Sequence, residues 1–255
     1  MRFGICTTFD KIGLLEKLGY DYLEASIQSI AFLSDGEFEQ VKERIDASKL
    51  KVEAFNVLLP GDLKVVGPEA DEGRLVDYLC GAFARAKALG AEIVVFGSGG
   101  ARKRPENFPE EEAMQQLYRV ARIMAECAAP FGITVVSEPL NRGETNTVNS
   151  LAAGYVLAEA AAHPNFQLLA DIYHMALENE GPEEITKYGD RLRHVHIANP
   201  KGRVYPLEEG EFDYRSYLKA LQAAGYDARI SVEAGTEDME TDGAKALALL
   251  QSLWG

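Results

Sequence analysis

Four residues with ligand-forming side chains recur along the C-terminal half of the chain, each at the end of a short apolar run. They are Glu138, Asp171, His196 and Glu233, separated by 33, 25 and 37 residues. One acid in such a place is commonly a helix N-cap, but four in succession indicate a shared role. Two glutamates, an aspartate and an imidazole form an oxygen-rich set suited to Mn²⁺, Mg²⁺ or Co²⁺, with Zn²⁺ as a further candidate. They predict a divalent-metal site, with Mn²⁺ as first choice.

The elements that must bring these side chains together alternate between short apolar runs and longer helical segments. Each run holds four to six residues rich in Val, Ile, Leu, Phe or Tyr without polar alternation, which predicts parallel strands covered on both faces. We expect strands at 2–6, 20–25, 51–56, 92–96, 134–138, 167–171, 194–197 and 229–233. In the longest helical segment, apolar residues from Met114 to Ala128 recur at steps of three and four.

Glycines punctuate this alternation. Gly19, Gly90, Gly132 and Gly225 each end a helical segment and lead into a strand, where a left-handed residue stops a helix. Eight strands, eight helical segments and no linker-like stretch predict an α/β fold, namely a closed (β/α)₈ TIM barrel forming a single domain over residues 1–255. An open doubly wound sheet is the alternative, and the count of eight argues against it.

The predicted barrel also predicts where the four ligands lie in space. Active sites of such barrels lie at the carboxyl-terminal ends of the strands. The fifth to eighth strands would therefore deliver Glu138, Asp171, His196 and Glu233 to one rim. We assign His194 a structural or supporting role, because we expect its ring to point away from the face that His196 occupies.

The composition narrows the range of partners. The chain has 26 basic and 40 acidic side chains and a net charge of −14. Nucleic-acid affinity comes mostly from Lys and Arg, so we expect no nucleic-acid partner. No stretch reaches the roughly 18 apolar residues that a membrane span needs, so we expect no membrane partner. Three widely spaced cysteines, and first residues without a signal-peptide core, predict a cytoplasmic protein with reduced thiols.

Two loop regions allow more than one interpretation. The glycine-rich residues 97–100 and the basic run 102–104 could cradle a sugar phosphate, but we favour a flexible loop with solvated charges. No Gly-x-Gly-x-x-Gly follows the first strand, so a nicotinamide cofactor has no support. Four apolar residues of the second and third βα loops could wall a sugar pocket, pack a lid or contact another subunit: Phe32, Leu33, Phe55 and Leu58.

Four segments resemble motifs of the D-tagatose/D-psicose 3-epimerase family, within the xylose-isomerase-like TIM barrel superfamily. Residues 138–144 (EPLNRGE) are similar to its Glu-x-Leu-Asn-Arg-x-Glu segment, and 171–175 (DIYHM) to its Asp-x-x-His-Met segment. Residues 194–196 (HVH) resemble its His-x-His, and 232–233 (VE) its last metal-binding glutamate. The N-terminal half matches only in its barrel pattern.

The resemblance implies a role for each of seven residues. The metal ligands would be Glu138, Asp171, His196 and Glu233, with Glu138 and Glu233 also acting as acid and base on opposite faces of the substrate. Glu144 and His174 would hydrogen-bond the sugar near C1 and C2, and Arg203 would also bind it. The family's arginine falls one residue closer to its histidine, and residues 199–203 lack its usual Gly-Glu, which leaves the ketose specificity open.

The resemblance implies an isomerase or epimerase that acts on a small sugar or keto-sugar. We expect a ketose 3-epimerase that works through a metal-stabilised enediolate between two glutamates. A hydroxypyruvate isomerase, or a dehydratase of a keto-inositol (inosose), would use the same site. An endonuclease IV-like DNA repair enzyme ranks lower, because the chain is acidic. A homo-oligomer is a further expectation, since relatives often pair through their helices.

Overall fold

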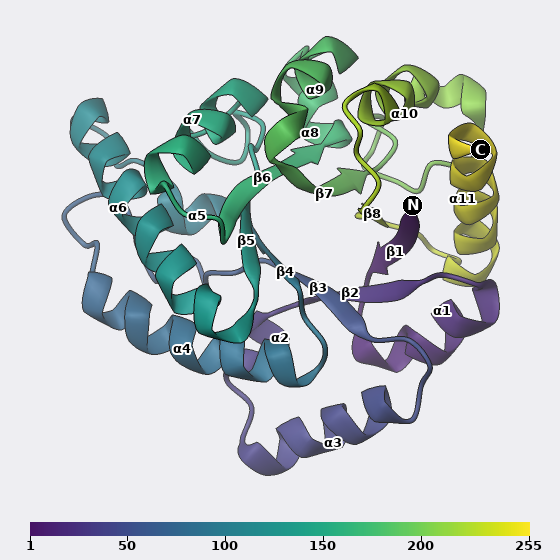
Figure 1. Ribbon diagram of the computed structural model, residues 1–255, viewed down its shortest axis with the longest axis horizontal. Coiled ribbons are helices and arrows are strands. Elements are labelled where there is room, and N and C mark those ends of the chain that lie inside the picture. The colour runs from purple at the N-terminus through teal and green to yellow at the C-terminus, as the bar shows by residue number, and fades with distance from the viewer.

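The computed structural model describes residues 1–255 as a closed barrel of eight parallel strands, β1 to β8 in sequence order (Figure 1). The strands are Arg2–Cys6, Tyr22–Ser26, Val52–Asn56, Ile93–Phe96, Thr134–Ser137, Phe166–Asp171, Leu192–Ile197 and Arg229–Val232. Strand β1 pairs with both β2 and β8, which closes the barrel. The predicted (β/α)₈ TIM barrel is therefore confirmed.

The predicted strand ends agree with the observed ones to within two residues. Strand β2 begins two residues late because the amide of Tyr20 still bonds to the carbonyl of Leu15, in the turn after the first helix. Strand β7 begins at Leu192, two residues before the predicted start. The prediction began later because the exposed Arg193 interrupts the apolar pattern. Glu138 and Glu233 directly follow β5 and β8, where the prediction had them as the last strand residues.

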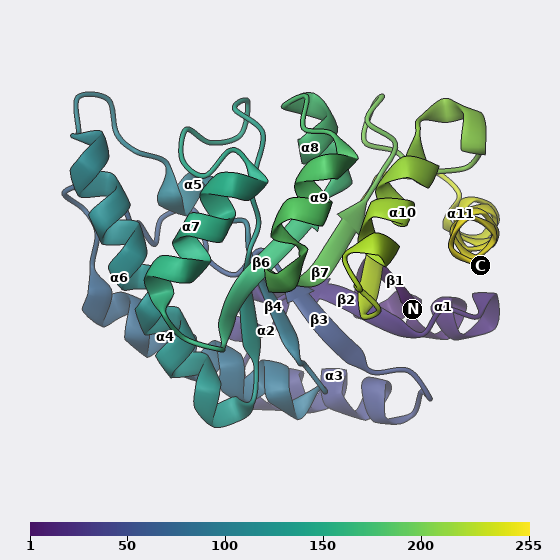
Figure 2. The ribbon, with the colours of Figure 1, turned by 45° about the horizontal axis from the view of Figure 1, so that its top comes forward.

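Eight longer helices, one after each strand, surround the barrel (Figures 1 and 2). They are α1 (Ile12–Leu18), α3 (Asp35–Asp46), α4 (Glu72–Ala88), α6 (Glu110–Ala128), α7 (Leu151–Ala161), α9 (Pro182–Tyr188), α10 (Tyr214–Ala223) and α11 (Met239–Trp254). Helix α11 packs beside α1, so the last helix closes the ring against the first. No helix is both long and apolar enough to cross a membrane.

Shorter elements lie within the loops. The short helices α2 (Gln28–Ala31), α5 (Gly99–Arg102) and α8 (Ile172–Leu177) follow β2, β4 and β6 closely, at the carboxyl-terminal rim. Single 3₁₀ turns cover Phe9–Lys11, Ala129–Phe131, Gly189–Arg191 and Glu209–Glu211. The four predicted glycine turns are all left-handed, with φ from 64° to 108°, as a helix-ending residue before a strand requires.

The barrel interior changes from apolar to polar towards the carboxyl-terminal rim. A buried cluster inside the strands consists of Tyr22, Ala54, Ile93, Val95, Val136 and Leu169. Glu138 stands two residues beyond Val136, and Asp171 two residues beyond Leu169. Side chains two apart share one face of a strand, so each acid follows an inward apolar residue. The site therefore rests on a packed apolar floor.

Gly4 on β1 leaves room for the ring of Tyr22, because a Cβ at position 4 would overlap three ring carbons. Tyr22 is fully buried and its hydroxyl lies 2.7 Å from Ser231 Oγ, so the ring has no free space to move into. We expect Gly4→Ala to lower the free energy of unfolding, measured by urea denaturation, by about 1–3 kcal/mol.

Gly81→Ala in α4 is the matched control, because a Cβ there meets nothing within 4 Å. Alanine inside this helix should raise the free energy of unfolding by roughly 0.5–1 kcal/mol. A Gly4→Ala protein as stable as the wild type would contradict the packing described for Tyr22.

Candidate active site and metal centre

The structure brings together the four residues predicted to bind metal. Glu138 directly follows β5, Asp171 ends β6, His196 lies in β7 and Glu233 directly follows β8. One ligand atom of each residue lies within 4.8 Å of the ligand atoms of the other three. Glu233 is partly exposed and the other three are buried.

The contacts among these groups fit a divalent cation. His196 Nδ1 lies 3.0 Å from Glu138 Oε1 and 3.3 Å from Glu233 Oε2. Asp171 Oδ2 is buried without any hydrogen-bond partner. Burial, together with the charges of Glu138 and Glu233, raises the pKa of Asp171 to about 8. A divalent cation would give this oxygen a ligand bond and offset the crowded negative charge.

Glu233 is held in its ionised form. Asn56 Nδ2 donates to its Oε1 at 3.1 Å, and Arg203 Nη2 donates to its Oε2 at 2.7 Å. Burial alone would raise the pKa of Glu233, but the charges of His196 and Arg203 outweigh it and hold that pKa at about 2. Glu233 is therefore a carboxylate at neutral pH.

His174 presents one ring nitrogen to the site as a donor. Both the backbone amide and Nδ2 of Asn141 donate to its Nδ1, at 3.2 and 2.9 Å. Its Nε2 therefore carries the hydrogen of the neutral ring. This Nε2 is buried without a hydrogen-bond partner, 3.5 Å from Asp171 Oδ2. Burial lowers the pKa of His174 to about 4, so the ring is neutral.

Arg203 reaches the site from the loop after β7. Its guanidinium pairs with Glu233 at 2.7 Å and with Glu144 at 3.2 Å, and lies over the ring of Tyr173 at 4.6 Å. Gly202 and Arg203 are both left-handed, with φ of 89° and 51°. This double turn directs the side chain inward, so the residue predicted to bind substrate lies at the site despite its shifted position in the motif.

A cavity of about 580 Å³ opens beside these groups and includes Glu138, Glu144, Arg203 and Glu233 in its lining. Hydroxyl and amide side chains from the β1 to β4 loops line its other side: Thr7, Thr8, Ser26, Ser29, Asn56 and Ser98. Such groups suit the hydroxyls of a sugar. No motif or spacing marked them in the sequence, because they are brought together only by barrel closure.

Of the three alternatives for the apolar loop residues Phe32, Leu33, Phe55 and Leu58, the pocket wall does not apply, because none of them lines this cavity. Phe55 and Leu58 are buried in the core. Phe32 is 68% exposed, and its ring lies beside that of Tyr78. The apolar lining comes instead from Phe9, Val57 and Leu140, together with Ala234. Phe55 follows Ala54, which faces the barrel interior, so strand alternation turns Phe55 outward into the main core cluster.

The interpretation of residues 97–104 as a flexible loop with solvated charges is wrong for Arg102, whereas Lys103 is exposed as expected. Residues 99–102 form the short helix α5, and Arg102 is fully buried. Its Nη2 donates to the carbonyl of Glu138 at 2.7 Å and its Nη1 to the carbonyl of Phe96 at 3.3 Å. The guanidinium therefore fixes the backbone of a site residue and does not face a phosphate.

A buried acid that the sequence analysis missed lies beneath the site. Glu24 of β2 is fully buried and contacts Nε2 of both His194 and His196, at 2.7 and 2.9 Å. Ser231 also donates to it, at 2.6 Å. His194 is not part of the four-residue cluster, but its ring does not point away from that of His196, contrary to what the sequence had led us to expect. Residues two apart in a strand share a face, so both rings point inward.

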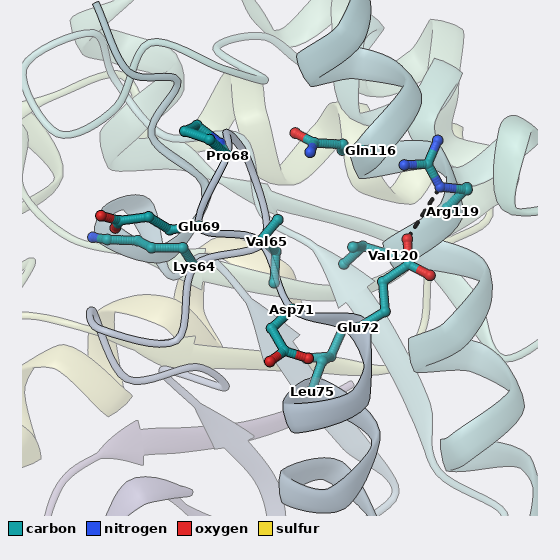
Figure 3. Close-up of a pocket in the computed structure, with 11 residues that line it drawn as sticks. Lys64, Val65, Pro68, Glu69, Asp71, Glu72, Leu75, Gln116, Arg119 and Val120 are labelled. Carbon is teal, nitrogen blue, oxygen red and sulfur yellow. Dashed lines mark hydrogen bonds and ion pairs between the residues drawn. The ribbon is translucent and has the colours of Figure 1, made fainter. Parts of the chain in front are cut away.

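The second cavity, of about 500 Å³, lies on the helical shell (Figure 3). Figure 3 shows Arg119 of α6 paired with Glu72 of α4, at 3.1 Å, and both side chains are about half exposed. Gln116 exchanges hydrogen bonds with the backbone of Gly67. The polar side chains that line it are not buried and several are already paired, so we assign no chemistry to this cavity.

The fold and the rim together define a class, the TIM-barrel proteins with acids and a histidine at the carboxyl ends of the strands. The model of the xylose isomerase-like TIM barrel family matches residues 12–253, and the chain belongs to this family. The resemblance found in the sequence is thus confirmed.

Individual relatives narrow the comparison. The chain is 28% identical over 245 residues to the L-ribulose 3-epimerase of Methylomonas sp. (strain DH-1), spanning 93% of this chain and 82% of that protein. It is 30% identical over 115 residues to the 3-dehydro-D-guloside 4-epimerase of Escherichia coli (strain K12), 44% of this chain and 42% of that one. The structure of D-psicose 3-epimerase with D-tagatose from Clostridium cellulolyticum H10 has a TM-score of 0.88 at 18% identity, covering 100% and 99% of the two chains. These relatives are sugar epimerases, the enzyme class that the sequence predicts.

Gly97, directly after β4, leaves the space that the Glu138 carboxylate occupies, because a Cβ at position 97 would overlap Glu138 Oε2. The carboxylate ends a flexible side chain, so it would move while the backbone stays in place. We expect Gly97→Ala to weaken Mn²⁺ binding, measured by calorimetric titration, by about tenfold or more, since small displacements of a site group are costly.

The matched control is Gly100→Ala in the same segment, where a Cβ would meet only Gly61 Cα at 3.7 Å. It should bind Mn²⁺ as the wild type does. Unchanged Mn²⁺ affinity in a folded Gly97→Ala protein would remove Glu138 from the ligand set.

Proposed function

We propose that this protein is a divalent-metal-dependent sugar epimerase that inverts C3 of a ketose, with Glu138 and Glu233 as its acid and base. The observation that carries the proposal is the convergence of these two carboxylates with Asp171 and His196 beside a polar cavity. The similarity to an L-ribulose 3-epimerase over 93% of the chain supports the same reaction.

Inverting a carbon beside a carbonyl needs a base on one face of the substrate and an acid on the other. Glu138 and Glu233 follow β5 and β8, which two strands separate, so they approach the rim from different sides. One glutamate, ionised, takes the C3 proton, and the other, protonated, donates its own proton to the opposite face. When bound, the cation supplies Lewis-acid stabilisation of the negative charge that develops on the sugar oxygen.

The ligand set and the surroundings favour particular partners. Glu138, Asp171, His196 and Glu233 would hold the ion, and their oxygen-rich chemistry favours Mn²⁺, with Mg²⁺, Co²⁺ and Zn²⁺ as alternatives. Three free cysteines support a reducing, cytoplasmic environment. A homo-oligomer stays a prediction.

Three further side chains would orient the sugar. His174 offers its Nε2–H, and Arg203 offers guanidinium donors beside Glu233. Glu144, which pairs with Arg203 at 3.2 Å, offers an acceptor for a hydroxyl. Donors and an acceptor around one point suit the neighbouring carbonyl and hydroxyl oxygens at C1 and C2.

A second candidate reaction is epimerisation at C4 of a 3-keto-glycoside, favoured by the 30% identity over 115 residues to 3-dehydro-D-guloside 4-epimerase. The C4 proton of such a sugar also lies beside a carbonyl, so the same two carboxylates would serve. Hydroxypyruvate isomerisation and inosose dehydration begin with the same proton removal and differ only in the fate of the enediolate.

Product analysis in D₂O separates these reactions. Mn²⁺-loaded protein is incubated separately with L-ribulose, D-psicose, D-fructose, D-tagatose, a 3-keto-glucoside and hydroxypyruvate, and products are identified by chromatography and NMR. We expect a C3 epimer that carries deuterium at C3. Turnover of only the 3-keto-glucoside or hydroxypyruvate would overturn the assignment to a ketose.

Glu233→Gln should lower kcat by about 10²–10⁴-fold, because glutamine keeps the shape but neither accepts a proton nor carries charge. The measurement is the rate of C3 epimerisation at saturating Mn²⁺, with circular dichroism to show that the barrel persists. Glu237→Gln, an exposed residue of the same loop, is the matched control and should turn over at the wild-type rate. Near-normal kcat in Glu233→Gln would contradict the two-carboxylate mechanism.

A further inference from the structure

We propose that Glu24 determines which ring nitrogen of His196 faces the metal site, and is therefore a positioning residue for the ligand set. The inference rests on the proposed metal-dependent function, because it concerns how one of the proposed ligands is oriented. Glu24 itself touches neither the cavity nor the other three proposed ligands, Glu138, Asp171 and Glu233.

Three donors surround the Glu24 carboxylate within the barrel. Oε1 lies 2.9 Å from His196 Nε2. Oε2 lies 2.7 Å from His194 Nε2 and 2.6 Å from Ser231 Oγ. An ionised carboxylate only accepts hydrogen bonds, so both histidines must carry a hydrogen on Nε2. The positions of Glu24, His194 and His196 thereby fix the tautomer of both rings.

The consequence for His196 is a defined ligand atom. Because Glu24 keeps the hydrogen on Nε2, Nδ1 is the nitrogen that would give up its hydrogen and offer a lone pair to a cation. That atom faces Glu138 Oε1 at 3.0 Å and Glu233 Oε2 at 3.3 Å. A lone pair and two carboxylate oxygens at this separation are complementary to a cation between them. Metal-binding histidines commonly donate their other N–H to a carboxylate, which orients the ring and raises its basicity.

A purely structural role would not need a carboxylate at this position. An apolar side chain would avoid the cost of burying a charge. Tyr22, two residues earlier on the same face, already fills the apolar floor, and its hydroxyl lies 2.7 Å from Ser231 Oγ. The His194 ring meets the His196 ring edge-on, with centroids 5.1 Å apart. His194 therefore also limits rotation of the His196 ring.

The thiol of Cys6 offers a competing metal site on the other side of the His196 ring. Ligand atoms of Cys6, Glu24 and His196 also lie within 4.8 Å of one another. An ion bound there would use His196 Nε2 and leave a hydrogen on Nδ1. The two arrangements therefore predict opposite protonation of the same ring.

The first test is Glu24→Gln. An amide offers one acceptor and one donor group, so it cannot accept from both histidines. We expect Mn²⁺ to bind 10–100-fold more weakly, the usual cost of losing such a partner, as measured by electron paramagnetic resonance of free Mn²⁺. The control is Glu53→Gln on β3, whose carboxylate pairs with Arg2 and Arg229. It should keep wild-type Mn²⁺ affinity, because it lies at the opposite end of the barrel.

The second test needs no variant to fold. In ¹⁵N-histidine-labelled wild-type protein loaded with diamagnetic Zn²⁺, we expect His196 to show a protonated Nε2 and a metal-bound Nδ1. A metal-bound Nε2, or equal Mn²⁺ affinity in folded Glu24→Gln and wild-type proteins, would overturn the inference. If one of these two results appears but the wild type binds Mn²⁺ and epimerises a ketose, the inference about Glu24 fails and the proposed function stands. If the wild type binds no ion, both fail.

Discussion

Repulsion between buried carboxylates is the constraint that organises the rim of this barrel. Glu138, Asp171 and Glu233 hold ligand atoms within 4.8 Å of one another. Two like charges at that distance repel by about 3.5 kcal/mol at an effective dielectric of about 20. The protein offsets part of this by placing the Arg203 guanidinium on Glu233, while burial raises the pKa of Asp171 to about 8. A divalent cation would relieve the repulsion at all three carboxylates.

The rest of the structure holds these groups in place against their repulsion. Register pairs Asp171 on β6 with His196 on β7, so two of the groups are fixed by adjacent strands. Arg102 anchors the carbonyl of Glu138 from the other side. Asn141 orients His174 with two donors, and Glu24 orients His196 from below. Buried partners thus hold two of the rim side chains and the backbone of a third, and positioned proton transfer requires groups that are held in this way.

The sequence was sufficient to predict the barrel and the residues that its rim collects. Unbroken apolar runs and helix-ending glycines are local signals. In the structure the runs form the strands, and the glycines adopt left-handed turns. Glu138 and Asp171 could be found because each ends such a run. Glu24 was missed although it lies within the predicted buried strand 20–25, because its partners His194 and Ser231 lie 170 and 207 residues away in the sequence.

Other errors have the same origin in tertiary packing. Arg102 stands in a basic run that looks solvated, yet the fold buries it against two carbonyls. His194 was assigned to the wrong face, although the two-residue period of a strand places it beside His196. Such contacts depend on how strands meet after the barrel closes, which no window of the sequence contains.

The most direct test of the metal site is anomalous X-ray diffraction from crystals soaked in Mn²⁺. We expect one strong peak at the carboxyl-terminal rim, coordinated by Glu138, Asp171, Glu233 and Nδ1 of His196. A peak between Cys6, Glu24 and Nε2 of His196, or no peak at the rim at saturating Mn²⁺, would contradict it.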